Sequence, residues 1–326
     1  MKITKIETIR LRSRATLIWV RIHTDDGLVG LGESWFGCAA IEADIHDRIA
    51  PALLGQNPSR IEALNRQMRP YVGFAGTSAE MRANSAVDVA LWDIQGKATG
   101  QPLYALFGGA TRDRIRVYNT CAGPDYVSKS SDVRPGNFGL DSEVTQRGKV
   151  FDDLRSFMTR ADELAAELLE MGIQSMKIWP FDFAEGAVDG GDISTEDLRR
   201  AMLPFQKVRE AHGDRMRLKA ELHGIWGLTA AKKICAALEE IAPKKGATVA
   251  EAFAKPVAFH DCSGPVTLAV STHLAMACPN VVEQEITRGF YYGWYHECVD
   301  QLPRLENGFI LPPEGTVSAS PWLLTS

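Results

Sequence analysis

The sequence has no closely spaced cysteine pair, no excess of positive charge and no long apolar run. Its six cysteines are scattered, which argues against a disulfide framework or a zinc ribbon and favours a reduced, cytoplasmic protein. A formal net charge of −5 argues against nucleic acid and membrane surfaces as partners. No apolar run reaches the roughly 20 residues of a membrane helix, and the N-terminus lacks the apolar core of a signal peptide. The expected partner is a small molecule.

The first hundred residues carry the pattern of a small α+β domain. Alternating apolar positions over Ile3–Leu11, over Leu17–Arg21 and over LVGLGES predict a three-stranded antiparallel meander. The stretch AEMRANSAVDVALWDIQGKATG then has apolar residues at three- and four-residue spacing, which predicts a helix that ends at Gly100. We predict that this domain comprises residues 1–113.

From Ile115 onward, strands alternate with helices, which predicts parallel strands joined by right-handed crossovers. Five strands can be read, namely IRVYNT, SMKIWP, MRLKAEL, PVAFH and NVVEQEI, and an irregular tail follows them. A closed barrel needs about eight strands and typically about 250 residues. Residues 114–326 therefore predict an open parallel sheet or a barrel that lacks part of itself.

One histidine stands out in the stretch AFHDCSGPV. His260 comes directly after an apolar strand and before a helix that a glycine opens, so it is either a catalytic base or a polar turn residue. Together with Cys262 it also suggests a zinc or thiolate site, but this signal is weak because no second pair of ligands accompanies it.

Other polar residues lie in or just after the predicted strands. Glu221 and His223 alternate with Leu222, so both side chains can face the same way at a strand end, or they lie in a solvated loop. Lys177 points either to the mouth of a barrel or outward into solvent. Glu285 belongs to the string EQE, for which an exposed strand end is the simpler interpretation.

Five strings occur in the order and context of one family: SAVDVALWDIQGKATGQPLYALFGG, KIWPFD, ELHG, FHDCSGPV and VVEQEITRGFYYGWY. Together they resemble the mandelate racemase/muconate lactonizing enzyme branch of the enolase superfamily, and within it the acid-sugar dehydratases. The resemblance implies an α+β capping domain over a TIM-type (β/α)₇β barrel. It also implies Mg²⁺ held by three carboxylates at the ends of the third, fourth and fifth barrel strands, and removal of a proton next to a substrate carboxylate.

The resemblance also assigns roles to residues of this chain. Glu221 matches the first metal ligand, at the end of the third strand. His223 matches a residue that serves as the acid toward the departing hydroxyl. His260 matches the base at the end of the seventh strand. Superfamily members pair such a Lys or His base with Mg²⁺, because the cation stabilises the ene-diolate that forms when the proton leaves.

The remaining matches concern the substrate carboxylate. Glu285 takes the place of the eighth-strand carboxylate that hydrogen-bonds the carboxylate of the substrate. Lys177 lies where the second strand often carries a Lys-x-Lys pair, whose second lysine is replaced here by Trp179. We therefore expect Lys177 and Glu285 to act in catalysis, and Trp179 and Glu285 to contact the substrate.

The chain departs from the family pattern in its middle. It has no Glu-Asp-Pro string for the second metal ligand, no Gly-Glu string for the third, and no sixth-strand aspartate to orient His260. Where these should lie the chain has only APKKGAT. Three missing units of roughly 30 residues each amount to about 90 residues. We therefore expect an incomplete barrel of five βα units, with Mg²⁺ bound weakly because Glu221 alone satisfies the ion poorly.

The sequence leaves several functions open. The first is a Mg²⁺-dependent lyase that removes water from a sugar acid, although the missing ligands argue against activity of the truncated chain. The second is a non-catalytic remnant or incomplete gene product that acts only by oligomerising, since the missing strands would leave bare edges. Racemase and cycloisomerase share the first proton abstraction with a dehydratase. No part of the sequence indicates which sugar acid is bound.

Overall fold

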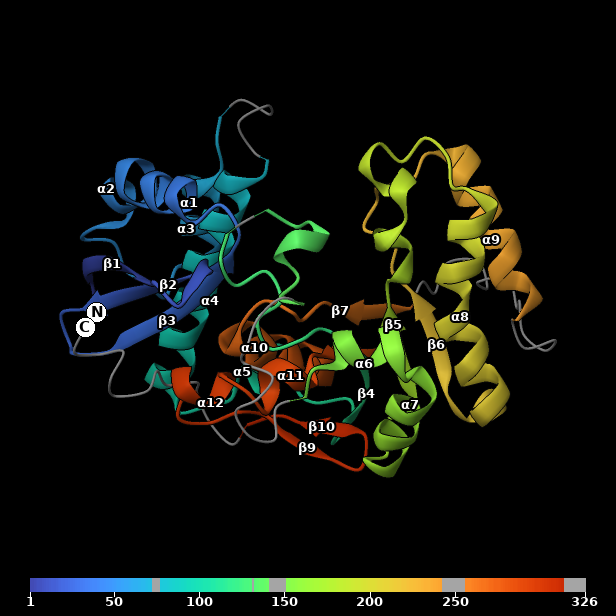
Figure 1. Cartoon of the computed structure of the whole chain (residues 1–326). Coiled ribbons are helices and arrows are strands. Elements are labelled where there is room, and N and C mark those ends of the chain that lie inside the picture. Colours follow the sequence, from blue (N-terminus) through green and yellow to red (C-terminus); the bar gives the residue numbers. More distant parts are fainter. Residues whose placement is uncertain (72–76, 131, 141–150, 242–255, 314–326) are drawn as a thin grey trace.

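The computed structural model describes residues 1–71, 77–130, 132–140, 151–241 and 256–313. Its first part is an antiparallel sheet in the order β1-β2-β3, which confirms the predicted meander (Figure 1). The strands are β1 (Ile3–Leu11), β2 (Arg14–Thr24) and β3 (Val29–Trp35). The helices that follow are α1 (Cys38–Asp44), α2 (Ala50–Leu53), α3 (Ile61–Met68) and α4 (Ala79–Thr99), with a π-helical turn over Ile45–Ile49 between α1 and α2. The predicted helix is confirmed as α4, which ends at Gly100 with a φ of 66°.

Two glycines allow α4 to lie directly on β3. A Cβ at Gly32 would lie 1.8 Å from the carbonyl oxygen of Ala86, and one at Gly30 would lie 2.1 Å from that of Ala90. No side chain fits at either position, so the backbones of the strand and the helix are in contact. This contact fixes the end of β3, which carries Glu33 and Trp35 toward the second part of the molecule.

The three-stranded sheet is buried on both faces. Successive side chains of a strand point to opposite sides, and in β2 Ile18 and Val20 belong to the core formed with the helices. Leu17 and Trp19, which alternate with them, belong to the core of the second part of the molecule. The sheet therefore packs between its own helices and the parallel strands, which makes it a cap on them.

The second part contains a parallel sheet in the order β6-β5-β4-β8-β7. Its strands are β4 (Ile115–Thr120), β5 (Ser175–Ile178), β6 (Arg217–Ala220), β7 (Val257–Phe259) and β8 (Val281–Ile286). All five predicted strands are confirmed, and the first and last of them, β4 and β8, lie side by side as in a barrel. The fold is α/β, with an α+β capping part and an incomplete TIM-type barrel. The predicted division between residues 113 and 114 falls just before β4 and stays a prediction.

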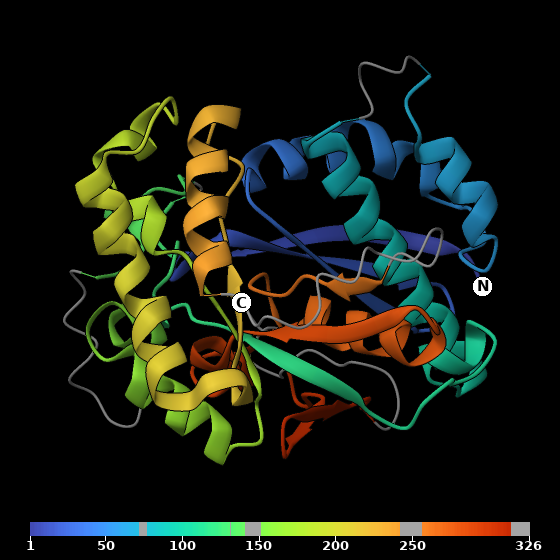
Figure 2. The same ribbon diagram turned by 90° about the vertical axis from the view of Figure 1, so that its right-hand side faces the viewer.

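The helices of this part are α5 (Leu103–Leu106), α6 (Asp153–Thr159), α7 (Ala161–Glu170), α8 (Thr195–His212), α9 (Leu228–Glu240), α10 (Pro265–Ala277), α11 (Arg288–Tyr291) and α12 (Tyr295–Cys298). Figure 2 shows α8 and α9 next to each other at the β6 end of the sheet. No helix in the described ranges is long and apolar enough to cross a membrane.

The parallel sheet ends in two edges. Within the described residues β6 pairs only with β5, and β7 only with β8. The chain that joins these two ends, residues 242–255, lies outside the described residues. The stretch APKKGAT, where three units are predicted to be missing, lies there too.

The prediction of an irregular tail is wrong over Arg304–Leu311. Strands β9 (Arg304–Glu306) and β10 (Phe309–Leu311) form an antiparallel hairpin, and β10 pairs with the start of β4. The two-residue turn is Asn307-Gly308, with φ values of 49° and 74°. An Asn-Gly turn of this kind is a strong hairpin signal, so the sequence itself contained the evidence.

Candidate active site

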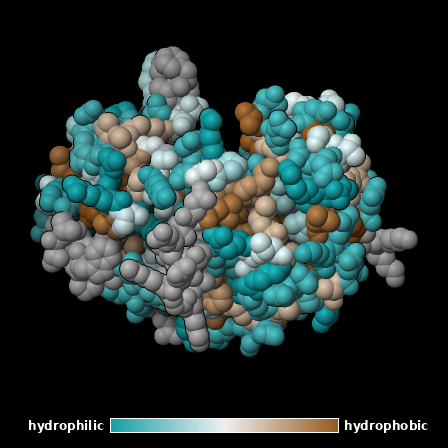
Figure 3. Space-filling model, viewed as in Figure 1, coloured by the Kyte–Doolittle hydropathy of each residue, from teal (hydrophilic) through white to brown (hydrophobic). Residues whose placement is uncertain are grey.

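A cavity of about 590 Å³ lies at the carboxyl ends of the parallel strands, where they face β3 and α4. Figure 3 shows that the molecule is hollowed between its two parts. Five of the six predicted site residues line the cavity: Lys177, Trp179, Glu221, His223 and His260. The sixth, Glu285, is fully buried and ion-pairs with Lys177. The carboxyl end of the strands is where TIM-type barrels carry their active sites.

Lys177 lies between two carboxylates at the mouth of the sheet. Its Nζ is 2.7 Å from Oε1 of Glu285 and 3.2 Å from Oε2 of Glu221. Burial alone would lower the pKa of Lys177, but the two carboxylates outweigh it and raise the pKa above its ordinary value. Burial would likewise raise the pKa of Glu221, but Lys177 and the backbone N–H of His223 lower it. The site therefore contains a fixed cation.

Glu285 lies beneath the cavity and binds two parts of the site. The interpretation of EQE as an exposed strand end is wrong, because Glu285 is completely buried. Its Oε2 accepts the backbone N–H of Asp261 at 2.9 Å, and its Oε1 accepts the hydroxyl of Thr120. It thereby holds Lys177 and the start of the loop after β7 in one place. Its contact with the substrate carboxylate stays a prediction.

His260 follows β7 and lies at the open side of the cavity. Its side chain is 61% exposed, and its Nε2 is 3.9 Å from Oε2 of Glu285. Desolvation within the cavity lowers the pKa of His260, and the charge of Glu285 offsets only part of this shift. A neutral imidazole is the form that accepts a proton. The ring of Trp35, from β3 of the cap, lies 6.4 Å from the imidazole.

His223 lies at the β6 side of the cavity, with its side chain 25% exposed. Its Nδ1 lies 2.7 Å from Oδ2 of Asp182, and its Nε2 lies 3.4 Å from the hydroxyl of Tyr126. The ring of Trp179 packs edge-on against the imidazole at 5.9 Å. Trp179 lines the cavity but is only 1% exposed, so its predicted contact with substrate is confined to a small part of the ring.

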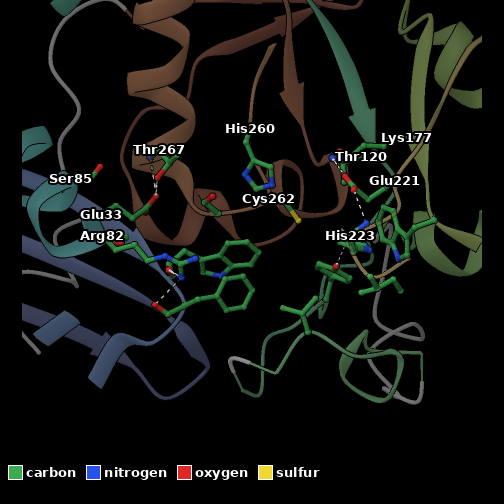
Figure 4. A pocket seen from close by; sticks show the side chains of 18 residues that line it. Glu33, Arg82, Ser85, Thr120, Lys177, Glu221, His223, His260, Cys262 and Thr267 are labelled. Atoms are coloured by element: carbon green, nitrogen blue, oxygen red, sulfur yellow. Dashed lines mark hydrogen bonds and ion pairs between the residues drawn. The ribbon is translucent and has the colours of Figure 1, made fainter. Parts of the chain in front are cut away.

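Glu33 of the cap holds the helix that follows His260. The carboxylate is buried and accepts hydrogen bonds from the backbone N–H of Thr267 at 2.9 Å and from its hydroxyl at 2.7 Å. It also accepts the indole N–H of Trp19 at 3.0 Å. Burial raises the pKa of Glu33 to about 7, although these donors oppose the shift. The carboxylate caps the N-terminus of α10 and joins the cap to the barrel (Figure 4).

The described residues do not fit a Mg²⁺ ion. No three or more of the described His, Cys, Asp and Glu side chains form a group that could hold a metal. A zinc site at His260 and Cys262 therefore has no third ligand among the described residues. Both oxygens of Glu221 already have protein donors: Oε2 faces Lys177, and Oε1 accepts the backbone N–H groups of Leu222 and His223. Mg²⁺ requires near-octahedral oxygen coordination. Weak binding of Mg²⁺ stays a prediction.

The comparisons with known proteins agree with this geometry. Residues 5–108 match the model of the mandelate racemase / muconate lactonizing enzyme N-terminal domain, and residues 242–316 match that of the enolase C-terminal domain-like family. The D-galactonate dehydratase of Pectobacterium atrosepticum is 30% identical, over 94% of this chain and 87% of its own length. The chain belongs to the mandelate racemase/muconate lactonizing enzyme family. Within this family it is acid-sugar dehydratase-like.

Solved structures of the family superpose on the whole chain. An enolase protein from the Sargasso Sea environmental genome has a TM-score of 0.81 at 32% identity, covering 99% of this chain and 96% of its own. An enolase of the mandelate racemase subgroup from Agrobacterium tumefaciens has a TM-score of 0.77 at 34% identity, covering 100% of this chain and 96% of its own. The alignment with the D-galactonate dehydratase of Ralstonia pickettii, 27% identical over 96% of this chain and 90% of its own, extends over 359 residues, more than the 326 of this chain. That relative therefore carries residues with no counterpart here.

Sequence reasoning missed Asp182, Glu33 and Trp35. Asp182 lies in the quoted string KIWPFD, but only the structure shows that the turn over Pro180–Phe183 brings it back to His223. Glu33 and Trp35 lie on the cap, more than two hundred residues before the groups that they contact. No local pattern in the sequence reports such contacts.

Proposed function

We propose that this protein removes water from a sugar acid. The observation that carries the proposal is that two imidazoles, from opposite ends of the parallel sheet, face one cavity that also holds a cationic lysine. Relatives named D-galactonate dehydratase support a sugar acid as the substrate class. The proposal covers the roles of His260, His223 and Lys177.

In the proposed reaction the ammonium of Lys177, two of whose three N–H donors can serve Glu221 and Glu285, gives its third to the substrate carboxylate. His260 takes the proton from the carbon next to that carboxylate, and Lys177 stabilises the negative charge that develops. The electron pair left on the carbon expels the hydroxyl of the neighbouring carbon. That hydroxyl takes a proton from His223 and departs as water. A single lysine stabilises the ene-diolate less than a divalent cation does, so we expect slow turnover.

The test is to incubate the purified chain with a panel of sugar acids, D-galactonate first, in D₂O. We expect deuterium to enter next to the carboxylate and a dehydrated product to form, both detected by mass spectrometry. The variant Lys177→Met should lose both signals, whereas Lys232→Met, at an exposed lysine of α9 that does not line the cavity, should keep them. A folded chain that neither exchanges the proton nor loses water from any sugar acid contradicts the proposal. Inversion at this carbon without loss of water would instead identify a racemase.

A second proposal concerns association. The edges at β6 and β7 favour pairing with another chain, because unpaired backbone groups at a sheet edge are templates for a further strand. We propose that the protein forms a homo-oligomer through these edges. Sedimentation of the chain should show species larger than a monomer, and insertion of a relative's fourth-to-sixth strand segment in place of APKKGAT should yield a soluble, Mg²⁺-binding barrel. A monodisperse, cooperatively melting monomer would contradict this proposal.

A further inference from the structure

The side chain of Asp182 has no role in the family resemblance, yet it makes the closest polar contact to the His223 ring in the described structure. Its Oδ2 lies 2.7 Å from Nδ1, and only 6% of Asp182 is exposed. Its other oxygen, Oδ1, is buried and has no hydrogen-bond partner among the described residues. Burying a carboxylate carries a free-energy cost unless it is paired. Within the described ranges its one side-chain partner is His223, so the imidazole is the group that this carboxylate serves.

The ring of His223 has aromatic neighbours and a strained backbone beneath it. Trp179 packs against it on one side, at 5.9 Å, and Phe138 lies 6.4 Å away. The backbone of His223 has a φ of 48°, a left-handed conformation that is strained for a residue with a side chain. The hydrogen bond from its N–H to Oε1 of Glu221, at 3.0 Å, holds that conformation in place.

The hydrogen bond to Asp182 determines which ring nitrogen carries the proton. A carboxylate only accepts, so Nδ1 must be the donor, and Nε2 is then the nitrogen that faces the hydroxyl of Tyr126 at 3.4 Å. Burial and neighbouring acids raise the pKa of Tyr126 above its usual range, so its hydroxyl stays protonated and can donate. The nitrogen that exchanges a proton with substrate is therefore Nε2.

We infer that Asp182 is a positioning residue for the loss of water: it accepts the Nδ1–H of His223, so that the second proton of the imidazolium lies on Nε2. The imidazolium gives that proton to the departing hydroxyl and is left as the neutral Nδ1–H ring. This inference rests on the proposed dehydration. It separates the two halves of the reaction, because His260 removes the carbon-bound proton and has no contact with Asp182 among the described interactions. Removing Asp182 therefore impairs the second half while the first half continues.

The test compares hydrogen exchange with dehydration in the same reaction in D₂O. In Asp182→Asn we expect exchange next to the carboxylate to stay within about twofold of the unaltered protein, while dehydration falls by roughly 10²-fold or more, the size of a lost acid or base contribution. Asp182→Glu should recover part of the dehydration. Asp189→Asn, an exposed aspartate seven residues further on, should change neither rate. Equal loss of both rates in Asp182→Asn, or loss of neither, overturns the inference.

A second measurement does not need activity. In the substrate-free protein, ¹⁵N spectra of labelled histidine should show the Nδ1–H form of His223, assigned by its absence in His223→Asn. The share of the Nε2–H form should rise in Asp182→Asn. An unaltered protein that already holds His223 as the Nε2–H form overturns the inference. If neither exchange nor dehydration occurs but the expected spectra are seen, the dehydratase proposal fails while the positioning by Asp182 stands.

Discussion

The two ends of the parallel sheet hold their imidazoles in different ways (Figure 4). At the β6 end the side chain of His223 is 25% exposed and bonded to Asp182, and its ring neighbours Trp179 and Phe138 also belong to the barrel. At the β7 end the side chain of His260 is 61% exposed, and its fixed neighbours, Trp35 and the helix held by Glu33, depend on the cap. The groups that hold the proton donor therefore belong to the barrel, whereas the base lies between Glu285 of the barrel and Trp35 of the cap.

The largest effect is expected at the base. His260→Asn should reduce any dehydration and any hydrogen exchange by a factor of roughly 10² to 10⁴, because the asparagine side chain cannot take up the carbon-bound proton. Circular dichroism should show an unchanged fold, since the side chain is largely exposed. His296→Asn, at another exposed histidine, serves as the control. Undiminished activity in His260→Asn would remove this residue from the mechanism.

A second effect concerns how the free energy of unfolding falls at low pH because of a buried histidine in α10, the helix that follows β7. His273 of α10 is fully buried, and neither ring nitrogen has a hydrogen-bond partner among the described residues. Burial lowers its pKa from 6.5 to about 4. The unfolded chain therefore takes up a proton first, and this contribution to stability is complete above pH 6.5 and is lost as the pH falls toward 4.

The variant His273→Phe should abolish this loss. Relative to the unaltered protein, its free energy of unfolding should rise by about 1.4 kcal/mol for each pH unit below 6.5. Urea titrations at several pH values measure the difference, and the exposed-site variant His296→Phe should follow the unaltered protein. A difference that does not change between pH 6.5 and pH 4 would show that His273 is not neutral in the folded state.

A smaller effect on stability is expected when one glycine at each edge of the parallel sheet is replaced by alanine. A Cβ at Gly264 would lie 2.4 Å from the carboxylate of Glu33, so Gly264→Ala should destabilise the fold by about 1–3 kcal/mol through overpacking. Gly224, next to His223, has open space around it and a φ of 67°. Gly224→Ala should cost about 1 kcal/mol from backbone strain alone. Urea unfolding of both variants measures the loss of stability. A greater loss in Gly224→Ala than in Gly264→Ala would show that the contact of Gly264 with Glu33 of the cap is not tightly packed.

The smallest effect is expected from Mg²⁺. Calorimetric titration should show binding in the millimolar range or weaker, because Glu221 is the only assigned ligand and Lys177 already neutralises it. Glu221→Gln should leave the titration nearly unchanged. Micromolar binding that disappears in Glu221→Gln would mean that the β6 end is a metal site. His223 would then lie beside a metal ion, and the contrast between the two imidazoles would be wrong.

Much of the fold was predictable because the spacing of apolar residues along the chain indicates strands and helices. Alternating apolar residues predicted the strands correctly, and helical spacing predicted α4. The family strings placed four site residues at strand ends that meet in one cavity, namely Lys177, Glu221, His223 and His260. The partner of His223 was not predictable, since a short turn after β5 decides where Asp182 points. The role of Glu33 depends on a contact between the cap and Thr267, 234 residues further along the chain, which no local pattern encodes.

The pairing of β4 has a consequence for the order in which the protein forms. The cap sheet uses only residues from Ile3 to Trp35, so its strands can meet as soon as they are synthesised. In β4, Val117 pairs with Gln284 and Ile115 with Ile310. Closing such long loops slows folding, and both partners leave the ribosome well after β4 does. The cap sheet is therefore complete while β4 still lacks β8 and β10, and in this interval the growing chain most needs protection from its neighbours.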